Sequence, residues 1–218
     1  MERYLDLLSL LILVSSFALV ASKRVKSYID TFQLQSVLVA LAAAVIGTYN
    51  FRAEGAIDVI LLCLVIVALK VIYIPMILKR TISQVEYTVE KDFYLNIPIS
   101  VLICCGLVIL SYFSLGPLEG IVGGSLKNYL VNSISVILIG LFFMMTRKKA
   151  IGQIVGFLVI ENGLFIAAML SSNGMPLIID LGIFIDLLTG VMIMGVLVFR
   201  ISETFETINV NKLRNLRG

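Results

Sequence analysis

The chain has 218 residues, of which 60% are hydrophobic and only 14% are charged, and its formal net charge is +3. Soluble domains average about half apolar and about a quarter charged residues, so the composition argues against a soluble protein and indicates a polytopic membrane protein. The sequence contains no histidine, and its three cysteines lie in apolar runs without a CxxC spacing. We therefore expect no metal site, no cofactor, no catalytic centre and no nucleic-acid binding in this chain.

Seven stretches are long and apolar enough to cross a bilayer, which takes about 20 residues of helix. In chain order they cover residues 4–22, 32–50, 56–78, 97–114, 128–146, 150–170 and 177–199. We read the first as a retained helix, because no small-residue cleavage site follows a basic head. Pro98 after Asn96 is typical of a helix start, and Pro75 predicts a kink in the third helix. The sequence thus predicts an all-α membrane protein of about seven transmembrane helices.

The positive charges predict how these helices are oriented. Of the 17 lysines and arginines, 13 fall in loops one, three and five and in the C-terminal tail, whereas 3 fall in the N-terminus and the even-numbered loops. Cytoplasmic segments carry such an excess, so we predict an external N-terminus and a cytoplasmic C-terminus. We divide the chain into four N-terminal helices with a cytoplasmic loop at 79–96 (residues 1–127), a three-helix unit (128–200) and a cytoplasmic tail (201–218).

Three charged residues lie deep inside predicted spans: Lys70, Glu161 and Asp186. With a rise of 1.5 Å per residue they lie about 12, 16 and 20 Å from the cytoplasmic face, respectively. An ionisable group in hydrocarbon costs several kcal/mol and usually has a partner or a task. Because burial raises the pKa of a carboxyl group toward neutral, such an acid can take up and release a proton. We predict Glu161 and Asp186 as relay carboxylates on one polar path, with Lys70 as a relay or modulating charge.

Simpler explanations exist for each of these groups. A buried acid can be a structural hydrogen-bond anchor, and a lysine stem can extend to the membrane surface. Asp58 and Asp180 lie near the predicted outer boundary, which suits interfacial charges or helix N-terminal charges. A possible secondary polar path would contain Asn162, Gln153, Asp180 and Asp58. Two glycine patterns, Gly152 with Gly156 and the stripe around Asp186, indicate close helix packing.

The last three helices resemble the small K subunit of complex I and its small counterpart in the multisubunit antiporters. Asp186, Gly190 and Arg200 in DLLTGVMIMGVLVFR follow the pattern of that family's third helix. In GFLVIENG, Leu158 stands where the family's second helix has a glutamate, and Glu161 follows three residues later. This shift corresponds to about 4.5 Å along a helix.

The full length resembles the hydrogenase-4 component E family of formate hydrogenlyase-type membrane subunits. The motifs are IENG, GIFIDLLTGVMIMG, and Lys70 followed by Ile74-Pro75. The resemblance implies a non-catalytic subunit of a group 4 [NiFe] hydrogenase complex in the prokaryotic inner membrane. It also implies antiporter-like and quinone-reductase-H-like membrane partners, a redox arm on the cytoplasmic side, and translocation of H⁺ or Na⁺. The alternatives are a stand-alone secondary cation carrier and a purely structural scaffold subunit.

Overall fold

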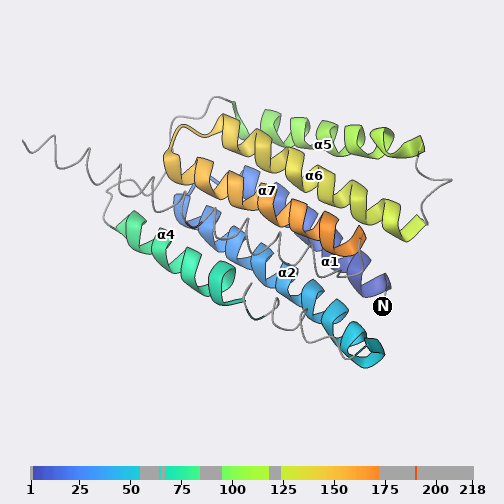
Figure 1. Cartoon of the computed structure of the whole chain (residues 1–218). Helices are drawn as coiled ribbons and strands as arrows, with labels where there is room; N and C mark the ends of the chain where they lie inside the picture. Colours follow the sequence, from blue (N-terminus) through green and yellow to red (C-terminus); the bar gives the residue numbers. More distant parts are fainter. Residues whose placement is uncertain are drawn as a thin grey trace, which may run out of the picture.

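The computed structural model describes residues 2–54, 64, 67–83, 95–117, 124–171 and 190, and the structural findings concern these residues. Their elements are α1 (Glu2–Ala21), α2 (Val25–Glu54), η1 (Val67–Tyr73), α4 (Ile74–Ser83), α5 (Ile97–Ser114), α6 (Gly124–Thr146) and α7 (Ala150–Ser171) (Figure 1). All are α-helices except η1, which is a π-helix. The prediction of an all-α protein is confirmed over these ranges.

Five of the helices in the described ranges are long and apolar enough to cross a membrane: Tyr4–Ala21, Val25–Thr48, Ile97–Ser114, Leu126–Thr146 and Ala150–Met169. They correspond to five of the seven predicted spans. The predicted span 56–78 is described at Leu64 and from Val67 onward, and of the span 177–199 only Gly190 is described. The count of seven and the orientation of the termini therefore stay predictions, as does the division of the chain into three parts.

The helix boundaries match the predictions best where turn residues mark them. The helix expected at 97–114 is α5, with Asn96 at its N-cap and Pro98 in its first turn. By contrast, α2 runs from Val25 to Glu54 instead of 32–50. Charged residues such as Lys26 and Asp30 are compatible with helix where the chain faces water, so the helix continues past its apolar part. For the same reason α4 continues through Ser83 into the predicted loop.

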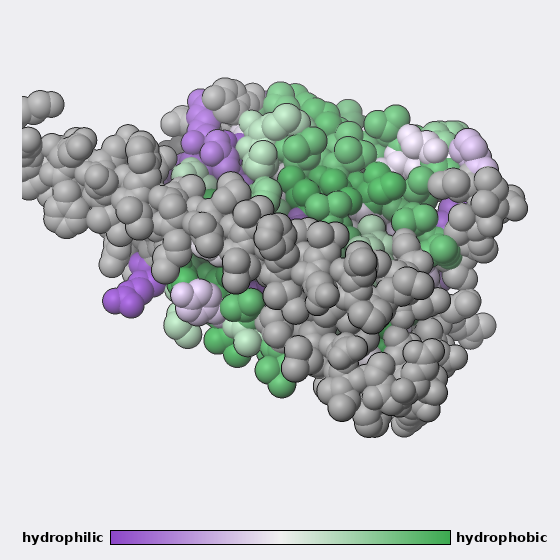
Figure 2. Space-filling model, viewed as in Figure 1, coloured by the Kyte–Doolittle hydropathy of each residue, from purple (hydrophilic) through white to green (hydrophobic). Residues whose placement is uncertain are grey.

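Helices α1, α2, α6 and α7 pack together, with α5 against α6 and α1 on one side and α4 against α2 on the other (Figure 1). The helix α5 is the least covered of the five candidate spans, and it exposes large apolar side chains such as Leu102 and Phe113. Figure 2 shows this side of the molecule as an apolar band with hydrophilic groups toward its ends. Such an arrangement suits a helix that faces lipid or another apolar surface.

Glycines let α6 and α7 approach closely, and this is the most extensive helix contact in the described structure. A Cβ atom added at Gly156 would lie 2.8 Å from the Cβ of Met144, and one added at Gly163 would lie 2.8 Å from Cγ1 of Ile137. Gly156 belongs to the pair of glycines, Gly152 and Gly156, from which the sequence predicted close helix packing. The contact fixes the position of α7, which carries Glu161.

Candidate functional site

Pro75 shapes the segment that carries Lys70. Proline has no backbone N–H, so Pro75 provides no hydrogen bond to the carbonyl of Val71 four residues earlier. The residues before it form the π-helix η1, with Lys70 in its middle. Gln33 of α2 donates its Nε2 to the Val71 carbonyl oxygen at 3.0 Å. At the position where the sequence predicted a kink, the structure thus has a π-helical turn, a rare feature that frequently occurs at functional sites.

Lys70 and Glu161 form a buried ion pair. The Nζ of Lys70 lies 3.6 Å from Oε2 of Glu161, and the two side chains are 1% and 3% exposed. Lys70 also donates to Oδ1 of Asn162 at 3.4 Å, and its Nζ lies 5.6 Å from the centre of the Phe165 ring. The lysine side chain thus points into the helix bundle, toward one region of α7, and does not extend to the surface.

A row of amide groups continues from this ion pair across the bundle. Asn162 donates its Nδ2 to Oε1 of Gln35 at 3.4 Å, and Gln35 donates its Nε2 to Oγ of Ser16 at 2.8 Å and to the carbonyl of Ile12 at 3.2 Å. A backbone carbonyl only accepts, so it fixes which end of Gln35 faces it, and Gln35 in turn fixes Asn162. The row therefore presents an amide oxygen to the Lys70 ammonium. We call Lys70, Glu161, Asn162, Gln35 and Ser16 the ion-pair network.

Four helical elements contribute to this network: η1, α7, α2 and α1. Helix α2 makes this possible because it packs against both η1 and α7. Its inward face combines the fully buried Gln35 and Ser36 with small residues such as Ala43.

Removing one partner of a buried ion pair typically costs about 3–5 kcal/mol, because the remaining charge is left uncompensated. The arrangement can hold a buried positive charge and a buried carboxylate together, and ionisable groups at such depth usually have a partner or a task.

The structure locates some of the predicted site residues and not others. Lys70, Glu161 and Asn162 come together. Gln153 instead lies near the start of α7, where it is exposed and its Nε2 donates to the carbonyl of Arg147 at 3.2 Å. The remaining predicted residues, Asp58, Asp180 and Asp186, lie outside the described part of the chain, so the predicted proximity of Glu161 and Asp186 stays a prediction.

Sequence reasoning missed Ser16 and Arg147. Ser16 is a single hydroxyl in an apolar helix, and only its depth relative to Gln35 could have indicated the contact. Arg147 falls in loop five, which the charge pattern predicts to lie on the cytoplasmic side, yet only 3% of it is exposed. Its Nη2 donates to the carbonyl of Val20 at 3.1 Å, and its guanidinium lies 4.3 Å from the Phe143 ring and 5.0 Å from the Tyr28 ring. This arginine thus joins the α6–α7 turn to α1 and α2.

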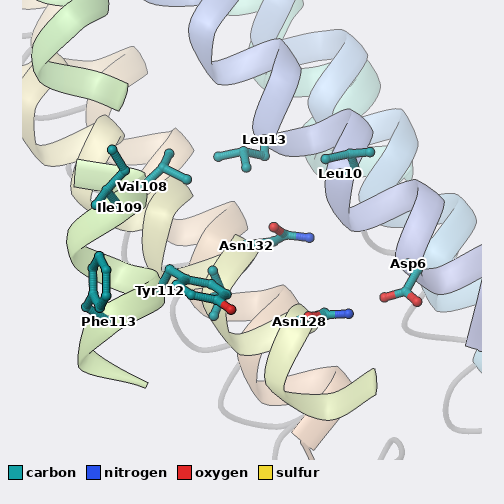
Figure 3. A pocket seen from close by; sticks show the side chains of 10 residues that line it. Asp6, Leu10, Leu13, Val108, Ile109, Tyr112, Phe113, Asn128 and Asn132 are labelled. Atoms are coloured by element: carbon teal, nitrogen blue, oxygen red, sulfur yellow. The ribbon is translucent and has the colours of Figure 1, made fainter. Parts of the chain in front are cut away.

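A separate groove of about 580 Å³ lies between α1, α5 and α6 (Figure 3). Its lining includes Leu10, Leu13 and Val108, with polar groups from Asp6, Asn128 and Asn132. No residue of the ion-pair network lines it. The groove therefore belongs to the packing of α5 against the bundle and not to the site.

The chain is similar to known proteins over about two thirds of its length. It is 33% identical over 153 residues to an uncharacterized protein of Mycobacterium tuberculosis, covering 70% of each chain. It is 25% identical over 149 residues to hydrogenase-4 component E of Escherichia coli K12, covering 68% of this chain and 69% of that protein, and the Shigella flexneri protein of the same name matches equally. No protein-family profile and no solved structure matches the chain. The chain belongs to the family that contains the mycobacterial protein and hydrogenase-4 component E, as the motifs around Lys70 and Glu161 predicted.

Proposed function

We propose that this chain is a non-catalytic membrane subunit of a group 4 [NiFe] hydrogenase-type complex, in which its buried charges carry protons or other cations through the membrane. The family relationship and the five apolar helices support a membrane subunit of such a complex. Partner subunits of the antiporter-like and quinone-reductase-H-like kinds, and a redox arm on the cytoplasmic side, would supply the chemistry that drives transport. The complex would lie in the inner membrane of a prokaryotic cell.

The observation that carries the relay proposal is the buried pair of Lys70 and Glu161. Their 3.6 Å separation is longer than the roughly 2.7–2.9 Å of a tight charge-assisted hydrogen bond. The carboxylate is therefore not locked to the lysine by a short hydrogen bond. Such a group can change its protonation state with a smaller loss of interaction than a tightly bonded one.

The row of amide groups also gives Lys70 an acceptor in the state in which Glu161 is protonated. A proton that binds the Glu161 carboxylate leaves a neutral carboxylic acid, and Lys70 then loses the negative charge of this neighbour. Lys70 keeps the Asn162 oxygen as an acceptor and the Phe165 ring as a second favourable neighbour. Both protonation states of Glu161 thus leave the ammonium with acceptors. This property supports a relay site rather than a fixed structural ion pair.

We assign Asp186 as the second relay carboxylate, because the sequence predicts it at a depth close to that of Glu161 on the following helix. Lys70 serves as the charge that biases proton exchange at Glu161. Asn162 belongs to this path as the lysine's alternative partner, and Asp180 and Asp58 are candidate groups toward the outer surface. Gln153 stays a candidate for the secondary polar path, at the α6–α7 turn where its side chain bonds the Arg147 carbonyl.

The proposal is tested by Glu161→Gln in the assembled complex, with proton uptake by membrane vesicles measured against redox turnover with a viologen dye. We expect proton translocation per turnover to fall by about tenfold or more, while the complex still assembles, because glutamine keeps the size of the side chain and an oxygen toward Lys70. Asp6→Asn is the matched control, since it neutralises an acid of α1 outside the ion-pair network. Wild-type translocation by an assembled Glu161→Gln complex would refute the relay. Loss of assembly at unchanged translocation per complex would favour a scaffold.

A further inference from the structure

We propose that Gln33 is a positioning residue for the relay, because it holds the π-helix that aims Lys70 at Glu161. The inference rests on the proposed function, although its central measurement does not depend on proton transport. The side chain of Gln33 bonds the Val71 carbonyl and Lys79. Its effect on Lys70 is exerted through the backbone of η1.

The first step concerns the backbone next to Lys70. Pro75 has no N–H, so an α-helical turn at this place would leave the Val71 carbonyl without its usual donor. A backbone carbonyl inside a membrane protein needs such a donor, because lipid supplies none. Gln33 offers one such donor from a neighbouring helix, with its Nε2 at 3.0 Å from the Val71 oxygen. The bond joins α2 to η1 at the residue that follows Lys70.

The second step concerns what holds Gln33 in this orientation. Its Oε1 accepts a hydrogen bond from Nζ of Lys79 at 3.0 Å, and the same Nζ lies 2.9 Å from Oδ1 of Asp30. Asp30 and Gln33 are three residues apart on α2 and so share one face of that helix. The ammonium of Lys79 can only donate, so it fixes the amide oxygen toward itself and the amide nitrogen toward Val71. Gln33 is therefore oriented at both ends.

The third step links this orientation to the ion pair. A π-helix bonds residue i to i+5, whereas an α-helix bonds i to i+4, so exchanging one for the other turns every side chain of the segment about the helix axis. The contacts of Lys70 with Glu161 and Asn162, at 3.6 and 3.4 Å, depend on the present rotation of η1. Without the Gln33 bond, η1 would lose this connection to α2 at the residue that follows Lys70. The segment would then rearrange and move the Lys70 ammonium relative to Glu161.

The test uses Gln33→Leu and Gln33→Glu in the full complex, with the infrared band of the Glu161 carboxyl group as the readout. That band is identified by its disappearance in Glu161→Gln. We expect Gln33→Leu to displace the band and to lower proton translocation by about tenfold, the scale that small misplacements of reacting groups produce. Gln33→Glu, which keeps the oxygen for Lys79 but in its ionised form lacks the donor for Val71, should displace the band in the same way. Lys79→Met should have a smaller effect, because it only loosens the orientation of Gln33.

Two comparisons separate positioning from general damage. Asn132→Leu removes another amide that joins two helices, through its 2.9 Å bond to Ser9 Oγ, and should leave the carboxyl band unchanged. In a Glu161→Gln background, Gln33→Leu should cause little further loss of translocation, since both changes act on one ion pair. An unchanged band in Gln33→Leu would overturn the inference, as would an equal displacement in Asn132→Leu. If Glu161→Gln itself transports normally, the proposed function fails, while the band still decides whether Gln33 positions Lys70.

Discussion

The ammonium of Lys70 lies 3.6 Å from the carboxylate of Glu161, and neither side chain exposes more than 3% of its surface. The two residues come from segments far apart in the sequence, η1 and α7, which both pack against α2. Buried charges with a shared network of amide acceptors form a single electrostatic unit. The consequences of changing one partner therefore depend on whether the other is still charged.

Neutralising both partners should cost less stability than the sum of neutralising each one alone. We expect Lys70→Met and Glu161→Leu each to lower the free energy of unfolding by about 3–5 kcal/mol, because each removes one partner of a buried ion pair. The double variant should lose clearly less than the sum of the two single losses. Unfolding of the purified chain in mild detergent, followed by circular dichroism, measures all three values. Additive losses would show that the two charges are not coupled.

The close approach of α6 and α7 should not tolerate a methyl group. Gly156→Ala places a Cβ 2.8 Å from the Cβ of Met144 and 2.9 Å from backbone atoms of the same residue. We expect a loss of about 1–3 kcal/mol, because backbone cannot move aside as a flexible side chain can. The matched control is Gly106→Ala in α5, where no atom lies within 4 Å of the added Cβ. Thermal unfolding in detergent compares the two, and equal midpoints would contradict the packing described.

Replacing Arg147 with lysine should lower the stability of the protein. The planar guanidinium of Arg147 lies over the Phe143 and Tyr28 rings and also donates to the Val20 carbonyl. The compact ammonium of a lysine cannot reproduce this combination. We expect Arg147→Lys to cost about 1–3 kcal/mol, in the range for a buried acceptor that loses its donor. The exposed neighbour serves as the control, and Lys148→Gln should change stability by less than about 0.5 kcal/mol. An unchanged unfolding midpoint in Arg147→Lys would show that charge alone suffices at this position.

The orientation predicted from the positive charges is open to a direct measurement. Reporter domains fused after Pro117 and after Gly218 should report opposite sides of the membrane, with the reporter at Gly218 in the cytoplasm. The expectation follows from the excess of lysine and arginine in alternate loops. Alkaline phosphatase and green fluorescent protein, which are active on opposite sides, make a suitable reporter pair. Equal activity of one reporter at both sites would rule out the seven-helix topology.

The sequence alone determined the class of the protein, because hydropathy and charge are summed along the chain and need no knowledge of neighbours. Helix ends were predicted where local chemistry marks them, as at Asn96 and Pro98 of α5. They were misplaced at α2, since Lys26 and Asp30 fit a helix at the water boundary as well as they fit a loop. Family membership also followed from the sequence, through the residues around Lys70, Glu161 and Asn162.

Only the tertiary structure decided which charges meet. Helix rise gives the depth of Lys70 and Glu161, but it does not give the direction in which each side chain points around its helix. That direction depends on the π-helical turn before Pro75 and on the packing of α2 against both η1 and α7. The amide row from Asn162 through Gln35 to Ser16 likewise joins residues that no local pattern connects. Depth is a property of one helix, whereas an ion pair requires the rotation and spacing of two.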